Sequence, residues 1–324
     1  MQTRQLGKTD FDITPVGLGT WAIGGGCWVA GCGPQDDEES IATIHRALDL
    51  GINWLDTAAV YGLGHSEEIV GKALQGRADR PYVFTKCSRL WNDKGEVFGN
   101  LKEQSIRREV ENSLSRLQVD VIDLYQMHWP DPDSDLEEGW STMAKLKAEG
   151  KVRHIGVSNF NVNQLRRAQE IAPIDSLQPP FSLVRPDVAN NGVLDFCQEH
   201  NIGVIVYSPM MSGLLTGTMT SDRIANLPDD DWRKHDAHFQ EPELSRNLAL
   251  ANLLTEIGYP HSRSTGEVAI AWTLQHPAVT AAIVGGRHPK QVEDTIGAAE
   301  FRLSESELAQ IDKFLQENPQ SAQK

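Results

Sequence analysis

The fold class follows from one stretch of the chain, which reads VIDLYQMHW (121–129), DLEEGWSTMAKLKAEG (135–150) and VRHIGVSN (152–159). The first and third runs are largely apolar and are typical of buried strands. The middle segment has apolar residues at helical spacing and ends on Gly150, a residue type favoured just beyond a helix C-terminus. The stretch therefore predicts a strand, a helix and a second strand, which is the repeating unit of a parallel sheet.

The same alternation recurs along the chain. Strands are predicted at 15–20, 53–58, 82–87, 121–129, 152–159, 174–180, 202–208 and 281–286. Amphipathic segments such as 38–51 and 105–118 lie between them. Repeated strand-and-helix units with no Ser/Gly-rich or Pro-rich linker favour a closed α/β barrel, the (β/α)8 or TIM barrel, over an open doubly wound sheet. We expect residues 1–324 to form a single domain of this kind.

Other segments lie outside the minimal barrel. They are an N-terminal β-hairpin (2–7 and 11–14), an insertion after the seventh strand (216–264) and a C-terminal helix (304–317). The insertion should end in an extra helix at 243–258, and it either covers a ligand or forms a solvated surface loop. In the C-terminal helix, Ser304 and Glu307 have the spacing of a capping box.

The composition is that of a globular protein, with 40% hydrophobic and 23% charged residues. The net charge of −15 disfavours nucleic acid and anionic membranes as partners, because both are polyanions. The sequence shows no signal-peptide pattern and no run near the roughly 20 apolar residues of a membrane span. We expect a cytoplasmic protein that is a monomer or a weak homo-oligomer.

The cysteines are Cys27, Cys32, Cys87 and Cys197, too few and too scattered for a disulfide framework. Cys27 and Cys32 lie close in sequence, but no second pair of Cys or His residues completes a zinc set. We expect reduced thiols and no metal site.

Polar or glycine-rich groups stand at the ends of consecutive predicted strands. In chain order they are Asp56, Lys86, His128, Ser158-Asn159, Gln178, Tyr207-Ser208 and Gly285-Gly286-Arg287. The catalytic residues of a (β/α)8 barrel come from the carboxyl ends of its strands. Because a purely structural barrel needs no titratable groups there, their shared placement predicts an active site.

Individually, several of these residues also have a structural explanation. Asp56 could cap the following turn, and His128 could be a hydrogen-bonded core histidine. Tyr61, just beyond the second strand, looks by itself like a packing residue. Lys86 is harder to explain, because an inward-facing lysine needs a partner, and Asp56 on the neighbouring strand is the natural one.

Together, these four side chains suit the reduction of a carbonyl group, which requires a hydride at carbon and a proton at oxygen. A free phenol has a pKa of about 10, and a nearby ammonium group lowers that pKa. On this interpretation Tyr61 supplies the proton, and Lys86, kept charged by Asp56, lowers the pKa of the phenol. The imidazole N–H of His128 holds the developing alkoxide.

The motifs of this chain resemble those of the aldo-keto reductases over nearly its whole length. The matching segments are GLGTW (17–21), DTAAVYG (56–62), FTKC (84–87), LYQMHWPD (124–131), GKVRHIGVSNF (150–160), YSPMMSGLLTG (207–217) and IVGGRHPKQVED (283–294). The resemblance implies a reductase of aldehydes and ketones in which NADP(H), with NAD(H) possible, lies extended across the strand ends. The catalytic tetrad that it implies is Asp56, Tyr61, Lys86 and His128, with Tyr61 as general acid/base.

The resemblance also implies a set of cofactor-binding positions. Ser158, Asn159 and Gln178 would hold the nicotinamide carboxamide, and Tyr207 would stack on the ring. The remaining positions are Gly19, Thr20, Trp21 and Asp56 on the cofactor and substrate side, Ser208, Met210, Ser212, Gly213 and Leu214 along the pyrophosphate, and Gly285, Gly286, Arg287 and Gln291 around the adenosine phosphate.

Two segments depart from the family pattern. Many relatives grip the 2′-phosphate with a Lys-Ser pair and a later Arg, where this chain has Gly285-Gly286-Arg287 and Gln291. With Arg287 as the phosphate ligand, NADPH is preferred and NADH is possible. The segment GGGCWVAGCG at 24–33 is longer than expected and either shapes substrate choice or forms a surface turn.

Three other hypotheses stay open at this point. The chain could be a cofactor-sensing regulatory subunit, or a dehydrogenase that mainly oxidises sugars or polyols. It could also be a lyase with a Schiff base on Lys86, although a charged lysine is a poor nucleophile. The expected pocket consists of the loops at 24–33, 87–98 and 129–134 with the insertion. Its aromatic residues, expected to favour aldehydes, sugars or small ketones, are Trp28, Trp91 and Trp129.

Overall fold

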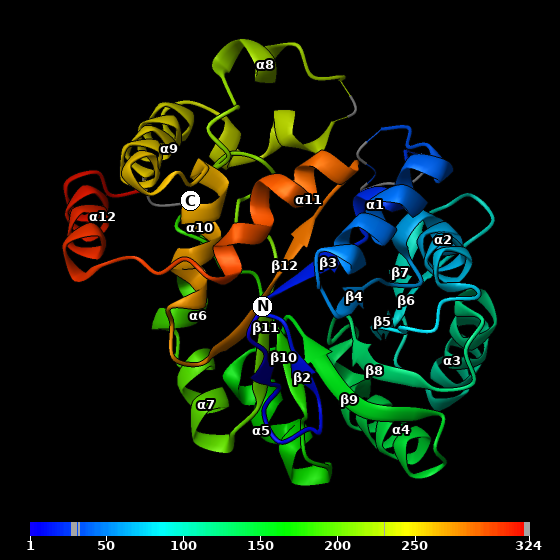
Figure 1. The fold of residues 1–324 in the computed structure, drawn as a ribbon. Helices are drawn as coiled ribbons and strands as arrows, with labels where there is room; N and C mark the ends of the chain where they lie inside the picture. The colour runs from blue at the N-terminus through cyan, green and yellow to red at the C-terminus, as the bar shows by residue number, and fades with distance from the viewer. Residues whose placement is uncertain (27–30, 32, 230, 321–324) are drawn as a thin grey trace.

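Parallel strands form a closed barrel at the centre of the molecule (Figure 1). Within residues 1–26, 31, 33–229 and 231–320, which the computed structural model describes, the barrel has eight strands. They are β3 (Val16–Gly19), β4 (Trp54–Asp56), β5 (Tyr82–Cys87), β8 (Ile122–Met127), β9 (Val152–Ser158), β10 (Ser176–Gln178), β11 (Gly203–Val206) and β12 (Val279–Gly285). Each overlaps one of the predicted runs, so the predicted (β/α)8 barrel is confirmed.

Helices surround the barrel and cover the outer faces of its strands (Figure 1). They are α1 (Asp37–Asp49), α2 (His65–Leu74), α3 (Glu103–Leu117), α4 (Leu136–Ala148), α5 (Val162–Ile171), α7 (Val193–His200), α10 (Thr265–Leu274) and α11 (Pro289–Ile296). Local sequence sets their ends: Asn161 and Gln164 form a capping box at the start of α5. After α4, Gly150 has a φ of 77°, a left-handed conformation that glycine adopts without strain.

The N-terminal hairpin, β1 (Arg4–Gln5) with β2 (Asp12–Ile13), closes the amino end of the barrel. Its side chains Leu6 and Phe11 are fully buried in one cluster with Trp54 and Phe84 from the barrel strands. The hairpin is tied to the far end of the chain, because the Arg4 guanidinium donates to the carbonyl oxygens of Leu274, Val279 and Thr280 at 3.2–3.3 Å. Closure of the barrel also brings together segments that are far apart in the sequence, since β12 pairs with β3.

A tight contact between β3 and β4 fills this end of the barrel. A Cβ atom added to Gly17 would lie 2.1 Å from Cε2 of the Trp54 ring. Trp54 is completely buried, and its indole N–H donates to the Thr14 carbonyl oxygen at 2.9 Å. The indole therefore occupies the space that a side chain at position 17 would need.

We expect Gly17→Ala to lower the free energy of unfolding by about 1–3 kcal/mol, because the added methyl group overpacks a rigid core. Urea denaturation of the variant measures the loss. Combining the change with Trp54→Leu should cost less than the sum of the two single changes, since leucine makes room for the methyl group. Full additivity would contradict the clash.

The C-terminal helix and the insertion also form as predicted. Helix α12 (Glu305–Glu317) begins at the Ser304–Glu307 capping box. It packs against α9 (Glu243–Gly258), the extra helix of the insertion, on the left of Figure 1. Among its described residues, the rest of the insertion holds α8 (Ser221–Ala225) and three 3-10 turns.

The short elements that were not predicted include a hairpin and a turn of helix. The segment 87–98, expected as a loop, contributes an antiparallel hairpin of β6 (Arg89–Trp91) and β7 (Val97–Gly99). A single turn of helix, α6 (Asp187–Asn190), precedes α7. Both are too short to produce a clear periodicity in the sequence.

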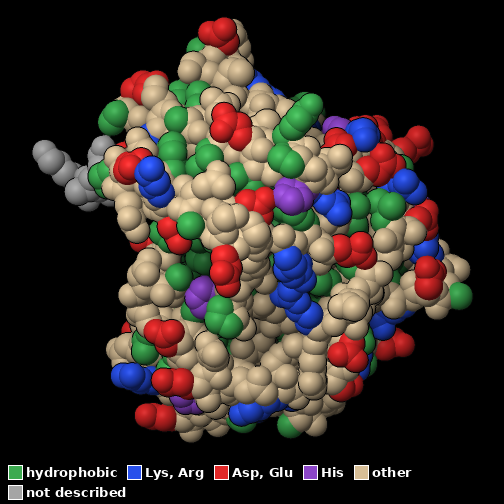
Figure 2. Space-filling view, turned by 60° about the vertical axis from the view of Figure 1, so that its left-hand side comes forward, with side chains coloured by type: hydrophobic (Ala, Val, Ile, Leu, Met, Phe, Trp, Pro, Cys, Tyr) green, Lys and Arg blue, Asp and Glu red, His purple; other side chains and the backbone are tan. Residues whose placement is uncertain are grey.

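The surface carries charges of both signs. On the face drawn in Figure 2, acidic and basic side chains are interspersed. On this face, neither sign of charge is gathered into one large patch. Among the described helices, none combines the length and the apolar character that a membrane crossing needs.

Candidate active site

A lysine–carboxylate pair lies at the carboxyl ends of β4 and β5. In the parallel register Asp56 stands beside Phe84, and side chains alternate along a strand, so Lys86 projects on the same face as Phe84. Lys86 Nζ donates to Asp56 Oδ1 at 2.6 Å and to the Thr57 carbonyl oxygen at 2.8 Å. Both charged side chains are almost fully buried. The structure therefore forms the predicted pair.

The third contact of the lysine reaches Tyr61. Lys86 Nζ lies 3.5 Å from Tyr61 Oη, so three oxygen atoms face the three donors of an ammonium group. Burial lowers the pKa of Lys86 below its usual range, while the Asp56 carboxylate acts in the opposite direction. The Asp56 carboxylate therefore neutralises much of the lysine charge, and one N–H donor of the ammonium group is directed at the phenol oxygen of Tyr61.

Tyr61 begins the 3-10 turn Tyr61–Gly64 that follows β4. Loss of water around the hydroxyl raises the pKa of Tyr61 well above its usual range, and the Asp56 carboxylate raises it further. The net shift of the Tyr61 pKa is therefore opposite to the lowering expected from Lys86, because loss of water and the Asp56 carboxylate outweigh any opposing effect of the ammonium. The phenol is consequently protonated at neutral pH, the form that a proton donor requires.

His128 directly follows β8 and faces the tyrosine. Its ring centroid lies 5.8 Å from that of Tyr61, with the planes at 79°. Burial, Lys86 and Arg89 hold the pKa of His128 well below its usual range. The imidazole is therefore neutral, with one ring nitrogen as donor and the other as acceptor.

Two amide side chains complete the surroundings of Asp56. Gln178 Nε2 donates to Asp56 Oδ2 at 2.8 Å, and Gln126 Nε2 lies 3.4 Å from the same atom. The resemblance placed Gln178 at the cofactor carboxamide, whereas here its amide group contacts Asp56. Gln126 was not singled out from the sequence, although it lies two residues before His128 and therefore on the inward-facing side of β8.

Ser158, Asn159 and Tyr207 form a second hydrogen-bonded group beside His128. Tyr207 Oη donates to Asn159 Oδ1 at 2.8 Å, and Asn159 Nδ2 donates to the His128 carbonyl oxygen at 3.0 Å. Ser158 Oγ donates to the carbonyl oxygen of Gln178 at 2.7 Å. The side chains expected to hold the nicotinamide ring are thus brought together at one place.

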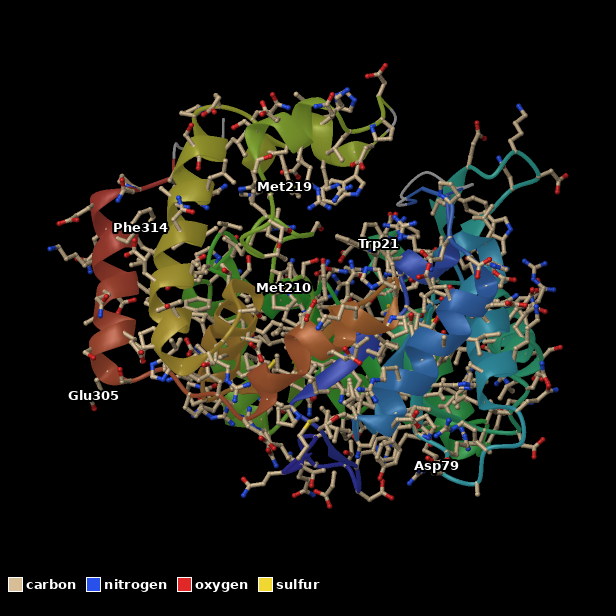
Figure 3. The ribbon with its side chains drawn as sticks, turned by 45° about the horizontal axis from the view of Figure 1, so that its top comes forward. Trp21, Asp79, Met210, Met219, Glu305 and Phe314 are labelled. Carbon is tan, nitrogen blue, oxygen red and sulfur yellow. The ribbon has the colours of Figure 1, made fainter. Side chains whose placement is uncertain are left out.

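The residues expected along the pyrophosphate follow β11. Ser208, Ser212 and Gly213 have positive φ angles of 56°, 50° and 94°, so the chain turns sharply here. Met210 packs on α10, because its Sδ lies 2.9 Å from a Cβ atom built on Gly266. Leu214 is fully buried. In Figure 3, Trp21 and Met210 both lie towards the insertion, and Asp79 lies away from them.

At the expected adenosine end, Gly19 of β3 pairs with Gly285 of β12. Gln291 accepts a hydrogen bond from the Arg287 backbone N–H at 2.8 Å. Arg287 Nε donates to Gln35 Oε1 at 2.8 Å, and its guanidinium also donates to the Pro34 carbonyl oxygen. Arg287 thereby joins the end of β12 to the segment before α1. Gln35 was not singled out from its position in the sequence.

The insertion reaches the same face of the barrel. Trp232 lies in an edge-to-face arrangement with Trp21, with ring centroids 6.3 Å apart. Thr20, beside Trp21, is buried and bonded to the Asp56 carbonyl oxygen. Of the two interpretations of the insertion, contact with the expected ligand face fits better than a purely solvated loop.

The remaining sequence expectations concern aromatic residues and thiols. Trp91 lies on β6, and Trp129 is 41% exposed beside His128. Cys87 and Cys197 are buried free thiols. Trp28, Cys27 and Cys32 lie outside the described residues, as does half of 24–33. In the described part of the chain, no three His, Cys, Asp or Glu side chains are grouped as metal ligands would be.

Fold and side chains define a (β/α)8-barrel protein with a buried lysine–carboxylate pair beside a tyrosine and a histidine. A model of the Aldo/keto reductase family matches residues 15–316. The chain belongs to this family of oxidoreductases, which use nicotinamide cofactors.

Three similar proteins illustrate the relationship. Aldo-keto reductase YhdN of Bacillus subtilis (strain 168) is 38% identical over 98% of this chain and 94% of its own length. The NADH-specific methylglyoxal reductase of Escherichia coli (strain K12) is 34% identical over 95% of this chain and 96% of its own. The structure of the glycerol dehydrogenase AKR11B4 from Gluconobacter oxydans superimposes with a TM-score of 0.91 at 36% identity, covering 100% of this chain and 98% of that one.

Proposed function

We propose that this chain reduces the carbonyl groups of small aldehydes and ketones to alcohols, with Tyr61 as the proton donor. The observation that carries the proposal is the position of Lys86 Nζ, bonded to Asp56 and the Thr57 carbonyl and directed at Tyr61 Oη. The His128 ring, just after β8, lies edge-to-face with the Tyr61 ring. We also propose that residues 1–324 act as one domain.

The residues at the strand ends fit a nicotinamide cofactor. Ser158 and Asn159 carry hydroxyl and amide groups that suit a carboxamide, and Tyr207 adds an aromatic face beside them. Gln178 lies at the same place, with its amide nitrogen bonded to Asp56. A Cβ atom on Gly285 would have no neighbour nearer than 3.9 Å, so the backbone can be approached closely there. When bound, the cofactor supplies a hydride to the carbonyl carbon.

The side chains of the site donate the proton, stabilise the resulting phenolate and orient the substrate. Tyr61 Oη gives its proton to the carbonyl oxygen, and the Lys86 ammonium stabilises the phenolate that remains. Asp56, held by Gln178, keeps the ammonium in place. The neutral His128 donates a hydrogen bond to the same substrate oxygen and orients it.

A panel of aldehydes, ketones and sugars, each offered with NADPH and with NADH, tests this proposal through the absorbance of the reduced cofactor. Turnover of an aldehyde in proportion to enzyme concentration supports it. Tight cofactor binding with no turnover of any compound would favour a regulatory subunit.

Polyol oxidation is the second candidate function, because a similar structure is that of a glycerol dehydrogenase. The same four side chains would act in reverse, with the Tyr61 phenolate accepting the proton of an alcohol. Turnover of polyols with the oxidised cofactor, and of no aldehyde with the reduced one, would favour this direction.

Cofactor choice depends on Arg287 in this proposal. We expect Arg287→Ala to raise the KM for NADPH about 10- to 100-fold, the effect of losing a charge-assisted hydrogen bond, and to change the KM for NADH far less. Lys313→Ala, on the exposed face of α12, is the matched control for a lost cation. Equal losses with both cofactors would show that Arg287 only holds Gln35 and Pro34 in place.

A further inference from the structure

A guanidinium group lies at the edge of the candidate active site. Arg89 begins β6, three residues after Lys86. Its guanidinium carbon lies 5.6 Å from the centre of the Trp129 ring, and Trp129 directly follows His128. Arg89 is also close enough to His128 to help hold the pKa of the imidazole low. The charge of Arg89 therefore acts at the place where the substrate oxygen is expected.

Much of the hydrogen-bonding capacity of this side chain is unused. Arg89 Nη1 donates to Asp131 Oδ2 at 2.9 Å. Towards the other residues that the structure describes, Nε and Nη2 donate no hydrogen bond. The side chain keeps 22% of its surface exposed, so solvent reaches part of it. A guanidinium has five N–H donors in a planar fork that matches a carboxylate or a phosphate.

The β6–β7 hairpin leaves room for the ion pair of Arg89 and Asp131. Gly99 on β7 stands opposite Arg89 on β6. A Cβ atom on Gly99 would lie 2.4 Å from the Asp131 carbonyl oxygen and 2.6 Å from its Oδ2. Asp131 thus lies directly over Gly99, and its carboxylate, 55% exposed, stays beside the guanidinium. An incoming anion would compete with a solvated carboxylate, which holds only one of the donors.

An exposed aromatic ring lies beside Arg89. Trp129, whose ring contacts the guanidinium, is 41% exposed, an unusual value for a large aromatic side chain. An aromatic surface with a cation at its edge suits a substrate that has an apolar body and one anionic group.

Building on the proposed function, we propose that Arg89 determines substrate specificity by binding an anionic group of the carbonyl substrate. The preferred substrates are then aldehydes or ketones that carry a carboxylate or a phosphate away from the reacting carbonyl. The fork of Arg89 holds the anion over Trp129, and the carbonyl oxygen lies between Tyr61 and His128.

Two aldehydes of the same shape test this inference: para-formylbenzoate, which is anionic, and para-formylbenzamide, which is neutral. The wild-type enzyme should show the higher kcat/KM with formylbenzoate. In Arg89→Gln, the ratio of the two kcat/KM values should fall about 10- to 100-fold, mainly through KM, because a charge-assisted hydrogen bond is lost. Arg89→Lys, which keeps the charge but not the fork, should retain part of the preference.

Removing the Asp131 carboxylate should strengthen the binding of an anionic substrate, whereas removing Arg89 should weaken it. Asp131→Asn removes the competitor of the substrate anion, so the KM for formylbenzoate should fall. Arg77→Gln is the matched control for Arg89→Gln, because it also replaces an arginine by glutamine. Arg77 is paired with Asp79, which lies away from the site in Figure 3. Its substrate ratio should equal that of the wild type.

The outcomes separate this inference from the proposed function. If the wild type reduces both aldehydes equally well, or if Arg89→Gln weakens both alike, Arg89 only supports Trp129 and the inference is wrong. If the wild type reduces neither with either cofactor, the proposed function itself fails. Glyceraldehyde phosphate, compared with glyceraldehyde, shows whether the anion is a phosphate rather than a carboxylate.

Discussion

Replacing Tyr61 with phenylalanine is expected to lower the kcat of carbonyl reduction by about 10²- to 10⁴-fold, the usual contribution of a positioned general acid. Phenylalanine keeps the ring that packs edge-to-face on His128. It removes only the hydroxyl group that lies 3.5 Å from Lys86 Nζ. The dissociation constant of the cofactor should stay close to that of the wild type. Steady-state kinetics and a fluorescence titration with NADPH measure the two quantities.

The pH profile gives a second readout for the same residue. Desolvation raises the pKa of Tyr61, so the proton-donating form persists through neutral pH. Reduction by the wild type should therefore hold its kcat through neutral pH and lose it only in alkaline solution. Near wild-type turnover by Tyr61→Phe would remove the phenol from the mechanism.

Replacing Lys86 with methionine is expected to destabilise the fold by about 3–5 kcal/mol, because it leaves the buried Asp56 carboxylate without its cation. Donation from Gln178 and Gln126 to the other carboxylate oxygen should keep the loss at the lower end of this range. Denaturant unfolding measures the stability, and activity should be lost as well.

A double variant separates charge burial from packing. Lys86→Met combined with Asp56→Leu removes both charges and should recover much of the stability without restoring activity. Lys313→Met, at a position where the side chain is 74% exposed, controls for the loss of a lysine. If Lys86→Met alone were as stable as the wild type, the expected cost of leaving Asp56 without its partner would be contradicted.

The barrel strands were predictable because their signal is local. A run such as YVFTKC carries its own burial pattern, and in the structure five of its six residues are buried. The β6–β7 hairpin was missed because its strands are three residues long and only partly buried. The residues Asn92 and Gly95 between the two strands are of types that favour a turn, and they are the signal from which the hairpin could be predicted.

In the candidate site, too, the features with a local signal were predictable and those that depend on distant contacts were not. Burial and pairing predicted Lys86 and Asp56, since a lysine in an apolar strand demands a carboxylate. The role assigned to Tyr61 rests on the family motif, because a tyrosine after a strand is usually a packing residue. The direction of its pKa could not be predicted, because it depends on how closely the folded chain surrounds the hydroxyl. Gln35 was missed because its partner Arg287 is 252 residues away.

The joining of the first and last strands has a consequence for biosynthesis. Strand β3 acquires its partner β12, and Arg4 acquires the carbonyl groups near Val279, only when the final fifth of the chain exists. Until then a nascent chain carries an open sheet whose two edges are unpaired, and unpaired edges invite association with other chains. The barrel can therefore close only after the segment that holds β12 has left the ribosome, so its last pairing step depends on a late part of the chain.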